Sequence, residues 1–152
     1  MTAISRRAAL GFLSLALAAC GRAAPASVEA SSNAGPKEIN RLISRYAKHY
    51  HIPESLLHRV VKRESGYNPA ARNGPYYGLM QILPQTARTM GYDGPANGLL
   101  DAETNLKYGA KYLRGAWLVS GKNPDKAVMW YSKGYYYEAK RLGLLKETGL
   151  KS

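Results

Sequence analysis

The sequence predicts a mainly α-helical domain with at most a minor β-hairpin. Apolar residues recur at helical spacing in several segments after residue 36, and no stretch alternates apolar and polar positions with β-branched side chains. The chain has 152 residues, which suits one compact domain and leaves little room for two. Its content of 45% hydrophobic and 21% charged residues is typical of a globular protein and argues against wholesale disorder.

The first segment, residues 1–19, predicts export. Arg6 and Arg7 precede an apolar run over residues 8–19 that ends at Cys20. A helix needs about 20 predominantly apolar residues to span a bilayer, so this run is too short and indicates the core of a signal peptide.

Cys20, the only cysteine of the chain, is a candidate for lipid attachment. The sequence Leu17-Ala18-Ala19-Cys20 resembles the bacterial lipobox, in which the cysteine is lipidated and becomes the mature N-terminus. The residue that follows is Gly21, not the Asp that retains such lipoproteins in the inner membrane. The resemblance therefore implies a periplasmic lipoprotein anchored in the outer membrane. A plain secretory signal is the alternative, and the paired arginines leave the Tat and Sec routes both open.

Residues 20–36 predict a flexible tether. This stretch is dominated by Ala, Ser, Gly and Pro and has no large apolar residue beyond Val28. Such a segment cannot bury enough surface to offset the entropy of ordering it. We therefore expect the folded domain to comprise residues 37–152.

Four helices are predicted within the domain, and each has a recognisable start or stop. Pro36 and Pro53 precede the first two helices, and Asp101 is a favourable N-cap for a third, long helix. Gly121 and Pro124 end the third helix, and a short helix through residues 127–130 follows. The apolar stripes are Ile39, Leu42, Ile43, Tyr46 and Tyr50; Leu57, Val60 and Val61; and Leu106, Gly109, Ala110, Leu113, Ala116 and Trp117.

Glu64 continues the apolar stripe of the second predicted helix. It follows Leu57 by seven residues and Val60 by four, whereas Lys62 and Arg63 are expected to point to solvent. A glutamate on an apolar face is costly unless it is paired or protonated, which makes Glu64 a candidate general acid. Alternatively, the helix frays before Glu64, and its side chain reaches water.

Glu64 belongs to the first of four sequence blocks that occur in a fixed order. The blocks are Glu64-Ser65-Gly66-Tyr67-Asn68-Pro69-Ala70-Ala71, Gly78-Leu79-Met80-Gln81-Ile82-Leu83-Pro84, Asn105-Leu106-Lys107-Tyr108-Gly109-Ala110-Lys111-Tyr112-Leu113, and Trp130-Tyr131-Ser132-Lys133-Gly134. Together they resemble the catalytic domain of the soluble lytic transglycosylases, relatives of goose-type lysozyme that cut peptidoglycan. The resemblance extends from about residue 39 to residue 135.

The resemblance implies a lysozyme-like helical fold with Glu64 as the catalytic acid. It also implies five substrate-binding residues: Ser65, Asn73, Met80, Gln81 and Tyr131. Met80 and Gln81 are expected to line the sugar groove, and Tyr131 to approach the catalytic carboxylate from across the cleft.

Some of these positions have other interpretations. Met80 could fill the core, and Tyr131 could be ordinary packing. Asn73 stands where the family often has a serine close to the acid, and Ser132 stands where it has an asparagine. Glu138 is not assigned the role of the second glutamate found in the family's longer tail.

The matched blocks contain one carboxylate, Glu64, which bears on the expected mechanism. Most glycosidases use two carboxylates, but one suffices when the substrate's own N-acetyl group stabilises the transition state. The family resemblance implies cleavage between N-acetylmuramic acid and N-acetylglucosamine with formation of a 1,6-anhydro ring, with no metal or organic cofactor. A lysozyme-type hydrolase and a non-catalytic glycan-binding protein remain alternatives.

The net charge of +12 indicates an anionic partner without identifying it. Loss of residues 1–19 would remove Arg6 and Arg7, which leaves 20 basic and 10 acidic residues and a charge of +10. Predicted export and the lack of a basic base-reading helix argue against nucleic acid, and peptidoglycan carboxylates are the favoured partner. A solvated surface without a special partner is the alternative. The sequence does not distinguish general wall remodelling from service to a secretion complex.

Overall fold

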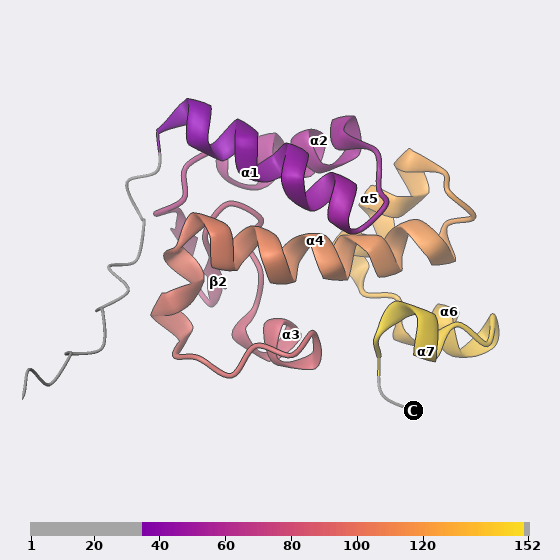
Figure 1. The fold of residues 1–152 in the computed structure, drawn as a ribbon. Coiled ribbons are helices and arrows are strands. Elements are labelled where there is room, and N and C mark those ends of the chain that lie inside the picture. Colours follow the sequence, from indigo (N-terminus) through magenta and orange to yellow (C-terminus); the bar gives the residue numbers. More distant parts are fainter. Residues whose placement is uncertain (1–34, 151–152) are drawn as a thin grey trace, which may run out of the picture.

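The computed structural model describes residues 35–150. The predicted signal peptide, Cys20 and nearly all of the predicted tether lie outside the described residues. Within residues 35–150 the chain forms seven α-helices, one 3-10 helix and one two-stranded hairpin (Figure 1). The prediction of a mainly helical domain with a minor hairpin is confirmed.

The elements follow one another with short connections. In chain order they are α1 (Pro36–His49), α2 (Glu54–Ser65), β1 (Arg72–Asn73), β2 (Tyr76–Tyr77), α3 (Pro84–Thr89), the 3-10 helix η1 (Ala96–Leu100), α4 (Ala102–Val119), α5 (Pro124–Lys133), α6 (Tyr136–Arg141) and α7 (Leu145–Thr148).

The four predicted helices correspond to α1, α2, α4 and α5. Asp101 caps α4 as expected, because its Oδ1 accepts a 2.8 Å hydrogen bond from the backbone N–H of Thr104. Asn123 caps α5 in the same way through the N–H of Lys126. The remaining helices are four to six residues long, too short to display a helical period in the sequence.

Helix α4 is the central element of the fold. It packs against α1 on one side and α5 on another, and α1 runs alongside it in Figure 1. The stripe predicted for α4 is its buried face, where Leu106, Ala110, Leu113 and Ala116 are fully excluded from solvent. Burial of these side chains and of the α1 and α2 stripes forms the main core.

A smaller apolar cluster lies beside the hairpin. It comprises Tyr77, Ile82, Ala87, Tyr92 and Leu99. Strands β1 and β2 are antiparallel, and Tyr77 forms a further antiparallel bridge with Ile82, which closes a tight loop over residues 78–81. This loop carries the Met80-Gln81 pair into the space between α2, α4 and α5.

No helix within residues 35–150 has the length and apolar character needed to cross a membrane.

Candidate active site

Glu64 lies in the last turn of α2, at the end of a fully buried stripe. Leu57, Val60 and Val61 have no solvent exposure, whereas the Glu64 side chain retains 23%. The helix does not fray before this residue. It continues to Ser65 and ends at Gly66, whose left-handed backbone (φ 58°) returns its N–H to the carbonyl of Lys62. The fraying alternative is therefore wrong, and Glu64 is held by regular helix at the edge of the core.

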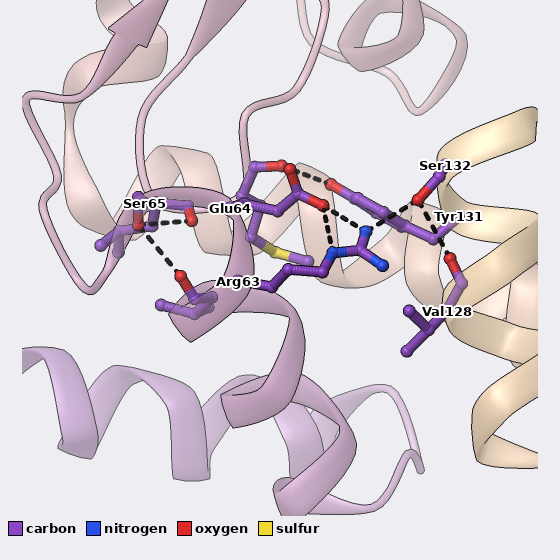
Figure 2. Close-up of polar contacts among 9 residues, drawn as sticks. Arg63, Glu64, Ser65, Val128, Tyr131 and Ser132 are labelled. Carbon is purple, nitrogen blue, oxygen red and sulfur yellow. Dashed lines mark hydrogen bonds and ion pairs between the residues drawn. The ribbon is translucent and has the colours of Figure 1, made fainter.

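The side chain of Arg63 is 40% exposed, in line with the expectation that it faces solvent, but its guanidinium also bends back over Glu64. Its Nε donates to Oε1 of Glu64 at 3.0 Å, and its Nη2 donates to the same oxygen. Nη2 also donates to Oγ of Ser132 at 2.7 Å, so the guanidinium bridges α2 and α5 (Figure 2). Ser132 in turn donates to the carbonyl of Val128 at 3.2 Å.

Ser65 ties the end of α2 to the loop over residues 78–81. Its hydroxyl lies 3.2 Å from the carbonyl oxygen of Val61 and 2.8 Å from that of Leu79. The first contact is the local i−4 bond typical of a helical serine, and the second is a tertiary bond. The residue predicted to bind substrate thus anchors the loop beside Glu64.

Tyr131 lies close to the carboxylate of Glu64 (Figure 2). Its hydroxyl donates to the backbone carbonyl of Met80 at 2.8 Å. Burial, with a further contribution from the negative charge of Glu64, raises the pKa of Tyr131 well above its ordinary value. The phenol therefore stays neutral and links α5 to the loop.

The side chain of Met80 belongs to the core rather than to a groove wall. It has no solvent exposure and packs against Gly109 of α4, which has no Cβ to obstruct it. The packing interpretation is therefore the one that the structure supports for this side chain. The backbone of Met80 nevertheless contributes its carbonyl to Tyr131.

Gln81 occupies a left-handed backbone conformation (φ 46°) and is partly exposed. Its Nε2 donates to the carbonyl of Ala71 at 3.1 Å and to that of Gly78 at 2.9 Å. The backbone thus holds the nitrogen of the Gln81 side-chain amide.

Asn73 does not reach the carboxylate. It lies exposed on β1, opposite Tyr76 in the hairpin, and no hydrogen bond within residues 35–150 joins its amide to Glu64. The expectation that this amide replaces the family's serine beside the acid has no support in this arrangement.

Asn105 has a role that the sequence did not reveal. It is fully buried on α4, where its Oδ1 accepts from the N–H of Met80 at 2.8 Å. Its Nδ2 donates to the carbonyls of Tyr77 and Leu99 at 2.8 and 2.7 Å. The signal was available, because an amide on the apolar face of a helix must find buried partners.

Two hollows flank the bridge that Arg63 makes. A cavity of about 250 Å³ is lined in part by Tyr76, Gln81, Tyr131 and Ser132. A shallower one of about 530 Å³ lies over the outer face of α2 and is lined by Ser55, His58, Arg59, Lys62, Arg63 and Tyr67. Glu64 lines neither hollow itself, but Ser132 and Arg63, the two ends of the bridge beside it, line one each.

Two other acidic side chains near the domain surface, Glu103 and Glu138, are paired away from Glu64. Glu103 accepts a 3.1 Å hydrogen bond from the hydroxyl of Tyr46 and pairs with Arg45, in a separate hollow of about 680 Å³ between α1 and α4. The carboxylate of Glu138 is hydrogen-bonded to Arg141, which lowers its pKa. No group of His, Cys, Asp and Glu side chains within residues 35–150 has the arrangement of a metal site.

The chain is similar in sequence to two kinds of lytic murein transglycosylase. Over 107 residues the chain is 35% identical to the soluble lytic murein transglycosylase of Escherichia coli K12, an alignment covering 65% of this chain and 16% of that protein. It is 40% identical over 76 residues to the membrane-bound lytic murein transglycosylase F of Shewanella woodyi, covering 49% of this chain and 15% of that one.

The fold is similar to that of a solved relative. The crystal structure of the 70 kDa soluble lytic transglycosylase from Escherichia coli superimposes with a TM-score of 0.61 and 30% identity, covering 74% of this chain and 19% of that one. A structure of the 70-kDa soluble lytic transglycosylase in complex with bulgecin A gives the same TM-score at 31% identity. This chain thus spans less than a fifth of each of these relatives. The model of the transglycosylase SLT domain matches residues 41–147, and the chain belongs to that family.

Proposed function

We propose that this domain is a peptidoglycan lytic transglycosylase that cleaves the β-1,4 bond between N-acetylmuramic acid and N-acetylglucosamine. The observation that carries the proposal is Glu64, a partly buried carboxyl group at the end of α2 next to Tyr131. It lies in the part of the chain that matches the family.

The reaction requires one group to act first as acid and then as base. Protonated Glu64 gives its proton to the bridging oxygen, and the bond between this oxygen and C1 of the muramoyl residue breaks. The Glu64 carboxylate then takes the proton from the muramoyl C6 hydroxyl as its oxygen bonds to C1. The 1,6-anhydro ring closes without water, and Glu64 ends in the protonated state in which it began.

The cationic character that develops at C1 needs stabilisation on the other face of the sugar. We assign this to the N-acetyl group of the muramoyl residue, because substrate assistance replaces the second carboxylate in several glycosidase families. Glu103 and Glu138 pair with Arg45 and Arg141 away from Glu64, which agrees with a mechanism based on one carboxylate.

The loop over residues 78–81 supplies the wall against which the sugar would bind. The Gln81 amide is held by two backbone carbonyls through its nitrogen, so its Oε1 is available to accept from a sugar hydroxyl or N-acetyl N–H. Tyr131 is fixed by its bond to Met80 and offers a neutral aromatic surface.

Digestion of purified sacculi with the wild type and Glu64→Gln, followed by mass spectrometry, tests the proposal. We expect anhydromuramoyl products from the wild type and none from the variant, whose amide has no acidic proton. Products heavier by one water would identify a lysozyme-type hydrolase. Binding to sacculi without products from either protein would identify a glycan-binding domain, and activity in Glu64→Gln would assign the acid to another residue.

We further infer that the chain is exported and carries a lipid on Cys20. The supporting observations are the short apolar run of residues 8–19 after Arg6 and Arg7 and the lipobox-like residues before Cys20. We expect the wild type to take up labelled fatty acid and to fractionate with the outer membrane, and Cys20→Ser to do neither. Equal fractionation of both proteins in soluble periplasm would instead indicate a plain secretory signal.

The net positive charge supports an anionic partner, and the predicted export favours the wall over nucleic acid. With 22 basic and 10 acidic residues, the chain would be attracted to the carboxylates of peptidoglycan in a salt-dependent manner. Sacculus binding should weaken as salt is raised and should exceed binding to duplex DNA at physiological salt. Tighter binding to DNA would contradict this proposal.

A further inference from the structure

The cavity of about 250 Å³ beside α5 is lined by one charged side chain within residues 35–150, that of Lys133. The remaining lining residues are tyrosines, aliphatic residues, an amide, two hydroxyl side chains and a glycine, with no carboxylate among them. Aromatic rings with a few amide and hydroxyl groups suit a neutral ligand such as a sugar. The single ammonium group adds a place for one negative charge on that ligand.

The ammonium group of Lys133 is free to bind an anion. Lys133 is the last residue of α5 and is exposed, and within residues 35–150 its Nζ has no hydrogen-bond or ion-pair partner. The basic side chains of α2 nearby are already engaged, because Arg59 pairs with Asp125 and Arg63 with Glu64. Lys133 can therefore offer all three of its N–H donors to a carboxylate in the cavity.

The cavity adjoins Glu64 through the end of α5. Tyr131 and Ser132, the two residues before Lys133, also line it. Ser132 accepts from Arg63, which is bonded to Glu64 as well, and Figure 2 shows Tyr131 and Ser132 on the side of α5 that faces Glu64. Consecutive Cα atoms are about 3.8 Å apart, so a sugar ring held beside Tyr131 is within reach of the long Lys133 side chain.

A negative charge distinguishes the two sugars that alternate in a peptidoglycan strand. The muramoyl residue carries a lactyl ether at C3, and the acidic stem peptide is attached to it, whereas N-acetylglucosamine has a neutral hydroxyl at C3. C3 is two bonds from C1 in the same ring. A cation that binds the C3 branch can therefore determine which of the two sugars presents its C1 to the catalytic acid.

We propose that Lys133 is a specificity-determining residue that binds a carboxylate on the C3 branch of the muramoyl residue. Lys133 thereby selects the muramoyl C1, and not that of N-acetylglucosamine, for the position beside Glu64. This inference rests on the proposed function of Glu64. The carboxylate belongs to the stem peptide where the peptide is present, or to the lactyl group itself in strands that have lost it.

Lys133 would also stabilise α5, because a cation in the last turn of a helix interacts favourably with the helix dipole. Loss of that interaction lowers the unfolding midpoint slightly and does not depend on the charge of the substrate. Binding of a carboxylate does depend on it. The test therefore compares substrates that differ only in charge.

Lys126 provides a matched control on the same helix. It lies seven residues before Lys133, is exposed and is not among the residues that line the cavity. Lys126→Gln and Lys133→Gln remove the same charge from α5, so the general attraction of the basic domain to an acidic strand falls similarly in both. Lys133→Arg keeps the charge and should retain most of the wild-type affinity.

The test measures kcat and KM of the full-length proteins on glycan strands that bear peptides and on strands stripped of peptides by an amidase. Each preparation is used unmodified and after its carboxylates have been converted to amides with a carbodiimide and ammonia. In Lys133→Gln we expect KM on unmodified strands to rise about three- to tenfold with kcat little changed, since the lost contact is present before and during the reaction. On amidated strands Lys133→Gln should match the wild type.

The unmodified preparations identify the source of the carboxylate. A rise in KM confined to peptide-bearing strands assigns it to the peptide, and a rise on stripped strands assigns it to the lactyl group. Three results would each overturn the inference: no change in Lys133→Gln on either unmodified preparation, an equal change in Lys126→Gln, or an equal change on amidated strands.

Binding to Glu64→Gln gives a readout that does not need turnover. The probes are N-acetylglucosaminyl-N-acetylmuramic acid, with and without an L-alanyl-D-glutamate dipeptide, and di-N-acetylchitobiose, which has no acidic group. Adding Lys133→Gln to this variant should weaken the binding of a muramoyl probe about three- to tenfold and leave the binding of chitobiose unchanged, as measured by NMR titration.

The two readouts separate this inference from the proposed function. If the wild type releases no anhydro products but loss of Lys133 weakens the muramoyl complex selectively, the proposed reaction is wrong and recognition of the carboxylate by Lys133 stands. If anhydro products form and all three probes bind equally well with and without Lys133, the proposed function stands and this inference fails.

Discussion

The side-chain Oδ1 of Asn105 accepts a 2.8 Å hydrogen bond from the backbone N–H of Met80, with both residues fully buried. The same amide donates to the carbonyls of Tyr77 and Leu99. One side chain of the central helix thus holds both the strand that leads into the loop over residues 78–81 and the 3-10 helix that precedes α4. The loop in turn places Gln81 beside Tyr131.

Replacement of Asn105 by Leu should strongly destabilise the domain. Leucine has a similar volume but cannot bond the buried N–H of Met80 or the buried carbonyl of Leu99, and each such loss costs about 1–3 kcal/mol. The carbonyl of Tyr77 keeps its bond from the N–H of Ile82. We expect the free energy of unfolding in urea to fall by about 3–5 kcal/mol. Asn123→Ala, which removes the exposed cap of α5, should cost about 1 kcal/mol. Similar losses for the two variants would contradict the central role of Asn105.

Gly78 should tolerate alanine less well than Gly74 does. Both have positive φ, 70° and 56°. A Cβ on Gly74 would meet nothing within 4 Å, whereas one on Gly78 would lie 2.4 Å from the carbonyl oxygen of Leu99 and 2.3 Å from Nδ2 of Asn105. We expect Gly74→Ala to cost about 1 kcal/mol from its backbone alone and Gly78→Ala about 3 kcal/mol or more. Thermal unfolding of the two variants measures the difference.

Ser65→Ala should impair catalysis more than stability. The substitution removes the hydroxyl that joins the end of α2 to the carbonyl of Leu79. One net hydrogen bond is worth about 1 kcal/mol, so the unfolding midpoint should fall slightly. The position of Glu64 relative to the loop should loosen, and kcat should fall about tenfold or more. Ser65→Thr, which keeps the hydroxyl, is the control, and a normal kcat in Ser65→Ala would show that the tie is dispensable.

Stability should decline as the pH rises above about 10. Burial is the main cause that raises the pKa of Tyr46 to about 12, and burial also raises the pKa of Tyr135. In the unfolded chain these phenols lose their protons near pH 10, while the folded domain still retains them. The unfolded state then binds fewer protons, so the free energy of unfolding falls between about pH 10 and 12.

Urea unfolding at about pH 9 and about pH 11 checks this pH dependence. Tyr135→Phe should have a lower starting stability, because it loses the bond to the carbonyl of Tyr112, but a smaller decline with pH. Tyr137→Phe, at a residue 84% exposed, should leave the decline unchanged. An equal decline in the wild type and Tyr135→Phe would count against a contribution from the buried phenol.

The long helices could be predicted because their determinants are local. Apolar residues of α1, α2 and α4 repeat at the helical period, and Asp101 and Asn123 cap helices within three residues of their partners. The four short helical segments could not be predicted in this way. They have fewer than two turns each and depend on tertiary burial of residues such as Ala87, Leu99 and Ala139.

The residues of the site likewise differ in whether local sequence or tertiary packing determines their position. The position of Glu64 on the apolar face of α2 follows from its spacing to Leu57 and Val60, and the family blocks point to it as well. The location of the Met80 side chain cannot be predicted from sequence spacing. Whether it lines a groove or fills the core depends on Gly109 of α4, which lies 29 positions away and leaves room for it.

Local patterns in the chain are enough to predict the helical class, the cap of α4 and the residue expected to carry the chemistry, since helical periodicity and capping act over a few residues. The partners of that residue were decided by tertiary structure. Arg63 of α2 donates a hydrogen bond to Ser132 of α5 as well as to its neighbour Glu64. The loop over residues 78–81 is held by the buried side-chain amide of Asn105. Such contacts depend on directions and distances between elements far apart in the chain, which no local pattern encodes.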